Sequence, residues 1–155
     1  MTNIKRELKR RISAVSLGSL AACLLLAPLG ASAEDLEVTD ARMRLLPGDM
    51  PAAGYFRLHN RSEQPVVLVR AQSDAFGSIE MHRSMNHDGM ASMEAVPRLE
   101  LSPDEHIEFA PQGYHLMLMD QVGSLSVGDS VDITLEFEQR DPLTVGFKAV
   151  SPTSM

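Results

Sequence analysis

The sequence predicts an all-β domain, a sandwich or barrel of about eight to nine short strands. Three observations carry this prediction. Short apolar segments rich in alternating or β-branched residues recur along the chain, clusters of Pro, Gly, Asn and Asp separate them, and no segment shows a convincing helical period. Short strands at regular spacing with turn signals between them are typical of sandwiches and barrels.

Each expected strand is bounded by residues that favour turns. In chain order, the expected strands are residues 36–46, 55–60, 66–73, 78–85, 90–96, 106–110, 114–120, 130–138 and 143–150. Residues 47–54 hold two prolines and two glycines, so we expect a loop there. Asp88-Gly89 is the strongest hairpin signal in the chain, and the Pro-Gln-Gly sequence at 111–113 predicts a further turn.

The first 33 residues have the composition of a secretory signal. Basic residues at 5–11 precede a long apolar run, and Ala-Ser-Ala at 31–33 fits a cleavage site. Pro28 and Gly30 favour cleavage over a membrane-spanning helix. We therefore expect export to a bacterial periplasm, cleavage after Ala33, and one domain at 34–155 without a membrane span.

A second processing route is open at Cys23. The sequence Leu-Ala-Ala-Cys at 20–23 resembles a lipoprotein box, which would anchor the protein through that cysteine. The apolar run continues past Cys23 and no polar tether follows it. The sequence therefore favours cleavage after Ala33 over lipid anchoring.

The composition of residues 34–155 excludes several classes of function. Nine basic and twenty acidic side chains give a net charge of −11, which disfavours binding to nucleic acid or an anionic membrane. This segment contains no cysteine, so it has no disulfide, no thiolate nucleophile and no cysteine metal ligand. A blue-copper electron carrier needs such a cysteine. No hydrolase motif is present either, and we expect no enzyme.

Histidine and methionine are concentrated in two short segments. Residues 81–93 hold two histidines and four methionines, and residues 115–119 read His-Leu-Met-Leu-Met. Thioether and imidazole groups suit the soft ion Cu(I), whereas Ca²⁺ and Mg²⁺ prefer oxygen ligands. Thioethers need no deprotonation, so only histidine ligands would make binding sensitive to pH. In a strand, His115, Met117 and Met119 would share one face.

Four of these residues form a longer motif, H-x10-M-x21-H-x-M, made by His82, Met93, His115 and Met117. This motif resembles the signature of the periplasmic copper chaperones of the PCuAC family. Residues 52–60, 111–120 and 127–138 also resemble segments of that family, so the similarity covers essentially the whole of 34–155. Gln112 and Asp120 stand where relatives often have glycine.

The resemblance implies a fold, a ligand and a role. The fold is a cupredoxin-like Greek-key β-sandwich, and one Cu(I) would be held by His82, Met93, His115 and Met117. The implied role is a monomeric chaperone that passes copper by ligand exchange to the CuA site of cytochrome c oxidase subunit II, directly or with a Sco-type thiol protein. Periplasmic copper sequestration for tolerance is the alternative, and a metal-free interaction sandwich is a third reading.

We assign no primary ligand role to the other histidines and methionines. Seven are expected to fill the core, lie at the surface or form hydrogen bonds: His59, His106, Met43, Met50, Met81, Met119 and Met155. Three lie in or beside the predicted hairpin turn, where a solvated loop is the alternative to a weak secondary site or hand-over path: Met85, His87 and Met90.

Overall fold

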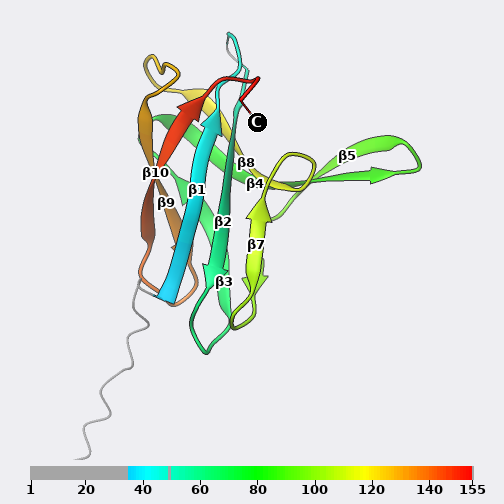
Figure 1. Cartoon of the computed structure of the whole chain (residues 1–155), viewed down its shortest axis with the longest axis vertical. Coiled ribbons are helices and arrows are strands. Elements are labelled where there is room, and N and C mark those ends of the chain that lie inside the picture. The colour runs from blue at the N-terminus through cyan, green and yellow to red at the C-terminus, as the bar shows by residue number, and fades with distance from the viewer. Residues whose placement is uncertain (1–34, 49, 155) are drawn as a thin grey trace, which may run out of the picture.

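The computed structural model describes residues 35–48 and 50–154, except for the side chain of His87. Within these ranges the chain forms ten β-strands and no α-helix (Figure 1). The all-β prediction is therefore confirmed. The predicted signal segment, Cys23 and Met155 lie outside the described residues. None of the described segments forms a helix of the length and hydrophobicity needed to span a membrane.

The strands are short and follow one another closely along the chain. They are β1 (Leu36–Arg44), β2 (Ala52–Asn60), β3 (Val66–Gln72), β4 (Phe76–His87), β5 (Met90–Ala95), β6 (Leu99–Leu101), β7 (His106–Phe109), β8 (Tyr114–Gln121), β9 (Ser130–Phe137) and β10 (Leu143–Val150).

Hydrogen bonding connects all ten strands in the order β5-β4-β8-β7-β2-β1-β10-β9-β3-β6. Strand β1 is the junction, because it pairs antiparallel with β2 along most of its length and parallel with β10 only at Arg42–Arg44. Figure 1 shows β9 and β10 on one side of β1 and β2 on the other. β2 also pairs with β8, so β4, β8 and β2 lie side by side.

Alternating side chains of the strands form one apolar core inside the fold. Phe56 of β2 stacks on Phe109 of β7 with ring centroids 4.1 Å apart, and Phe147 of β10 meets Phe56 edge-on at 5.6 Å. Phe56 and Phe109 are paired neighbours on adjacent strands, and aromatic contacts of both kinds bury large apolar areas in preferred geometries. Because successive residues of a strand face opposite sides, the other residues of β2, β4 and β8 are left for the outer face.

The β4–β5 hairpin extends beyond the body of the sandwich as an arm (Figure 1). Asp88 and Gly89 join His87 to Met90, and both have positive φ, at 52° and 80°. This is the conformation of a type I′ hairpin turn, which Asp-Gly favours. The predicted hairpin is confirmed. All six residues of β5 are exposed, so the arm has solvent on its free edge.

Two strand predictions were wrong in detail. Strand β6 was not predicted, because a three-residue strand with only two buried leucines gives almost no pattern. Residues 52–54 were predicted as loop but begin β2. Gly54 belongs there because β2 and β8 approach closely. A Cβ at this position would lie 3.2 Å from the Cβ of Leu116.

Asn60, at the end of β2, is fully buried and holds the turns around it. Its amide donates to the backbone carbonyls of Gln64, Leu101 and Ser102, and its carbonyl accepts from Ser62. One side chain thus joins β2 to the end of β6. A buried amide that satisfies several backbone groups is costly to remove.

We expect Asn60→Ala to lower the free energy of unfolding by about 2–3 kcal/mol, because it leaves buried carbonyls without donors. Denaturant unfolding followed by circular dichroism measures this change. Asn86→Ala, at an exposed position on the β4–β5 arm, is the matched control and should stay within about 0.5 kcal/mol of the parent. Equal effects of the two substitutions would contradict the anchoring role of Asn60.

Candidate metal centre

Strand register brings the four predicted ligands onto one face of the sheet. His82 of β4 lies directly opposite His115 of β8. Met117 lies opposite Glu80 in the same pair of strands, and Met93 of β5 lies opposite Ser84. Directly opposed residues of antiparallel strands project from the same face. The four side chains therefore project from three neighbouring strands to one side.

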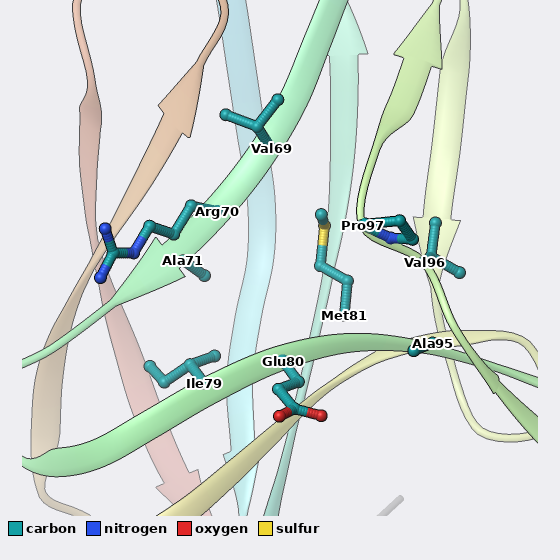
Figure 2. A pocket seen from close by; sticks show the side chains of 9 residues that line it. All are labelled: Val69, Arg70, Ala71, Ile79, Glu80, Met81, Ala95, Val96 and Pro97. Carbon is teal, nitrogen blue, oxygen red and sulfur yellow. The ribbon is translucent and has the colours of Figure 1, made fainter.

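This side is the outer face of the sheet. Met81, Leu116 and Leu118 alternate with the ligand positions and are buried in the core. Figure 2 shows the alternation at a small cavity of about 290 Å³ between β3 and β4. There Met81 points into the cavity, whereas the carboxylate of Glu80 lies on the opposite side of the β4 ribbon. The prediction that Met81 belongs to the core is confirmed.

A larger cavity of about 500 Å³ opens on the outer face. Met93, His115 and Met117 line it, and His82 is not among the lining residues. The ring of His82 lies beside that of His115, with centroids 5.9 Å apart and planes inclined by 43°. Residues from the 45–51 loop and the 111–112 turn complete the rim: Leu46, Met50, Pro51, Pro111 and Gln112.

The backbone fixes the orientation of His115. Its Nδ1 lies 3.1 Å from the carbonyl oxygen of Gly113, which also accepts the backbone N–H of Ser84 at 3.0 Å. The Nδ1–H group therefore donates, and the lone pair of Nε2 is left for a ligand. Metal-binding histidines commonly use their second nitrogen in this way, which sets both tautomer and ring orientation.

His82 is oriented by a carboxylate. Its Nε2 lies 2.9 Å from Oε2 of Glu80, two residues earlier on the same strand. Its Nδ1 is buried and has no hydrogen-bond partner among the described residues. A buried polar atom without a partner is uncommon in folded proteins. With the proton on Nε2, the free lone pair of Nδ1 is available to a metal ion.

The predicted ligands differ widely in exposure. His115 is buried, with 7% of its surface exposed, whereas Met93 on the arm is 52% exposed. Met117 and His82 are intermediate. The site therefore has an inner histidine and an outer thioether.

The turn before β8 supports the histidine orientation. Gly113 N–H donates to the carbonyl of Ala110 at 3.0 Å, and Gln112 between them has φ of 69°. Glycine adopts this conformation without strain, whereas a residue with a side chain does so less readily. Asp120, at the other position where the resemblance led us to expect glycine, also has positive φ, at 53°.

The sequence pattern did not indicate several residues of this site. Glu80 and Gly113 orient the two imidazoles, and Arg44 and Met50 line the cavity. Glu80 could have been predicted from the sequence, because it is two residues before His82 and therefore lies on the same face of the strand. Met50 comes from the loop after β1, Gly113 from the turn before β8, and Arg44 from the end of β1, which pairs with β2. No local spacing in the sequence reveals that these segments meet.

Comparison with known proteins identifies the family. The family model described as "Putative lipoprotein LpqE-like" matches residues 36–149, which include nearly every described residue. The chain belongs to the LpqE-like family. Protein RP573 of Rickettsia prowazekii is a relative of this LpqE-like chain. The two are 33% identical over 102 residues, which cover 64% of this chain and 56% of RP573. The chain thus matches little more than half the length of that protein.

A second relative matches from end to end. The Leifsonia xyli protein Lxx21020, which is also named as a lipoprotein, is 27% identical over 97% of this LpqE-like chain and 95% of its own length.

Solved PCuAC domains share the fold. The apo protein DR1885 from Deinococcus radiodurans has a TM-score of 0.60 and 26% identity, over 97% of this chain and 98% of its own. Its Cu(I) form, CuI-DR1885, has a TM-score of 0.59 and 28% identity over 85% of both chains. The copper-bound PCuAC domain of PmoF2 has a TM-score of 0.65 and 24% identity, over 76% of this chain and 94% of that domain. Together with the family match, these structures confirm both the PCuAC resemblance and the cupredoxin-like fold.

Proposed function

We propose that this protein binds one Cu(I) ion through His82, Met93, His115 and Met117 and transfers it to a thiol-bearing acceptor protein. The observation that carries the proposal is the convergence of two oriented imidazoles and two thioethers on one outer face of the sheet. The protein acts by binding and exchange, without catalysis.

The donor set fits a soft monovalent ion. Imidazole and thioether ligands carry no negative charge, so they do not balance the positive charge of Cu(I). The carboxylate of Glu80, which contacts His82, supplies a negative charge nearby. The unpartnered Nδ1 of His82 gains a partner when a metal binds. Hard cations would find no oxygen ligand among these four side chains.

Relatives support copper as the cargo. The Deinococcus radiodurans protein DR1885 has been solved with Cu(I), and it is 28% identical to this chain over 85% of both. The copper-bound PmoF2 domain adds support for the fold alone.

The gradient of exposure supports transfer over storage. A thiolate from an acceptor can first replace Met93, whose side chain is half exposed on the arm, while the buried His115 still holds the ion. A thiol-bearing acceptor binds a soft ion more strongly than thioethers do, so exchange runs toward it. A protein that only stores the ion is expected to enclose it on all sides, whereas Met93 of this site is half exposed.

We further propose the CuA site of cytochrome c oxidase subunit II, reached directly or with a Sco-type thiol protein, as the acceptor. The thiolates of such proteins meet the chemical requirement for withdrawing Cu(I). Deleting the gene should lower oxidase activity in copper-limited cells. Copper sensitivity with normal oxidase activity would favour the tolerance role instead.

Charge at the site differs from the average of the domain. Arg44 is the only Asp, Glu, Lys or Arg among the described residues that line the cavity, and its guanidinium lies 5.7 Å from the centre of the Tyr55 ring. The net charge of −11 therefore does not describe the cavity lining itself, although Glu80 lies nearby, beside His82. We propose that Arg44 attracts an acidic group on the acceptor.

We propose export, with the final location set by processing at Cys23 or after Ala33. The relatives named as lipoproteins add weight to lipidation at Cys23. The intact mass of the protein purified from cells separates an acylated Cys23 from a chain that begins at Glu34.

We expect the purified protein to take up one tight equivalent of Cu(I) in an anaerobic competition with a chromophoric chelator. His115→Ala and Met117→Ala should each weaken binding by at least about tenfold, because each removes one ligand. Met85→Ala is the matched control, since register places Met85 on the opposite face of β4 and it should leave the affinity unchanged. Binding that ignores both ligand substitutions would overturn the proposed site.

We expect Glu80→Ala to weaken Cu(I) binding about 10–100-fold although Glu80 is not a ligand, because outer carboxylates orient and strengthen metal-binding histidines. Glu94→Ala removes the same charge from the neighbouring strand, where Glu94 is opposite Arg83 on the other face. The same chelator competition should show no effect of Glu94→Ala. If both variants lose affinity equally, the effect is one of charge and not of histidine orientation.

A further inference from the structure

A second group of metal-binding side chains lies at the far end of β2. His59 is six residues along the strand from Ala53, which pairs with Met117 at the copper cavity. This separation corresponds to about 20 Å along an extended strand. Both positions have the same parity, so the second group is on the same outer face of the sheet.

Register aligns three of its members across adjacent strands. Glu37 of β1 lies directly opposite His59, and His59 lies directly opposite His106 of β7. Side chains of such partners start about 5 Å apart on one face. Asp104 lies in the turn just before β7, and its carboxylate contacts His59 from there.

The ligand atoms are already close together. Nε2 of His59 is 2.9 Å from Oδ1 of Asp104, and its Nδ1 is 3.7 Å from Oε2 of Glu37. The rings of His59 and His106 stack with centroids 3.6 Å apart. One ligand atom from each of His59, Asp104 and His106 lies within 4.8 Å of the others. Two ligands that share an ion at bond lengths of about 2.0–2.2 Å lie about 3 Å apart, close to the His59–Asp104 separation.

The turn that carries Asp104 is held in place by buried hydrogen bonds. Asp104 N–H donates to the carbonyl of Asn60 at 2.8 Å, and the Asn60 side chain binds the carbonyls of Leu101 and Ser102. The hydrogen bond from His59 lowers the pKa of the Asp104 carboxyl below its usual range, so this group is ionised at neutral pH. His106 is exposed, and its ring can turn about the broad terminal torsion to bring a nitrogen toward a shared ion.

We propose that His59, His106 and Asp104, assisted by Glu37, bind a divalent first-row transition ion, with Cu(II) the tightest. Imidazole and carboxylate ligands suit Cu(II) and Zn(II), and Cu(II) heads the general order of affinity. The group contains no thioether, so it does not suit Cu(I). Binding displaces only a proton on the coordinating nitrogen of each imidazole, which passes to the solvent, and involves no change of oxidation state.

Cu(II) titration of the purified full-chain protein tests this site, with binding followed by calorimetry and electron paramagnetic resonance. We expect one Cu(II) with nitrogen ligands. His59→Gln, His106→Gln and Asp104→Asn should each weaken it by about tenfold or more. Glu108→Gln is the matched control, because this exposed carboxylate contacts Arg57 instead, and it should bind as the parent does.

The position of the ion separates this site from the copper cavity. Cu(II) should broaden the amide resonances of residues 57–61 and 104–108, and the double variant His82→Gln/His115→Gln should retain the effect. Broadening centred on 113–117 or on the amino terminus would overturn the proposal. Loss of Cu(II) binding in the double variant would also overturn it. The same holds for weak Cu(II) uptake that the substitutions of His59, His106 and Asp104 do not change. Cu(I) uptake by His106→Gln should remain at one tight equivalent, so the two sites are judged independently.

Discussion

The direct pairing of His82 with His115 is the constraint on which the candidate copper site depends. Side chains of a strand alternate between faces, so a slip of one residue between β4 and β8 would move one imidazole into the core. The register is fixed from the other side of the sheet, where Met81, Leu116 and Leu118 are buried. The packing of apolar side chains on the inner face thereby fixes the positions of the ligand side chains on the outer face.

Hydrogen bonds then turn this placement into a site with defined lone pairs. The Gly113 carbonyl accepts from both His115 and the backbone of Ser84, so the same atom holds the ring and the strand pair together. Glu80 does the equivalent for His82 from within its own strand. Met93 differs, because its strand is an exposed arm. Two histidines oriented by hydrogen bonds beside an exposed thioether side chain are an arrangement that can hold an ion and still release it.

Much of this could be predicted from the sequence, and the failures have physical causes. Nine of the ten strands, the Asp88-Gly89 hairpin and the shared face of His115 and Met117 follow from alternation and turn chemistry, which are local. Strand β6 is too short to show alternation. The stacked pair of His59 and His106 could not be seen, because 46 intervening residues separate two histidines that only strand register makes neighbours. Each was expected to face solvent or form hydrogen bonds, and His59 does bond to Asp104.

The two groups of ligands differ in the ions that they suit, although they share one face of one sheet. Thioethers with imidazoles select a soft ion, and imidazoles with carboxylates select a borderline one. If both are occupied, the protein distinguishes the two oxidation states of copper by position.

X-ray absorption at the copper K edge of the anaerobic Cu(I)-loaded protein tests the central claim most directly. The account predicts nitrogen and sulfur neighbours in equal numbers, with one nitrogen lost in His82→Gln and one sulfur lost in Met93→Ala. A spectrum without sulfur, or one that neither substitution changes, would contradict the assignment of these four residues as the copper site.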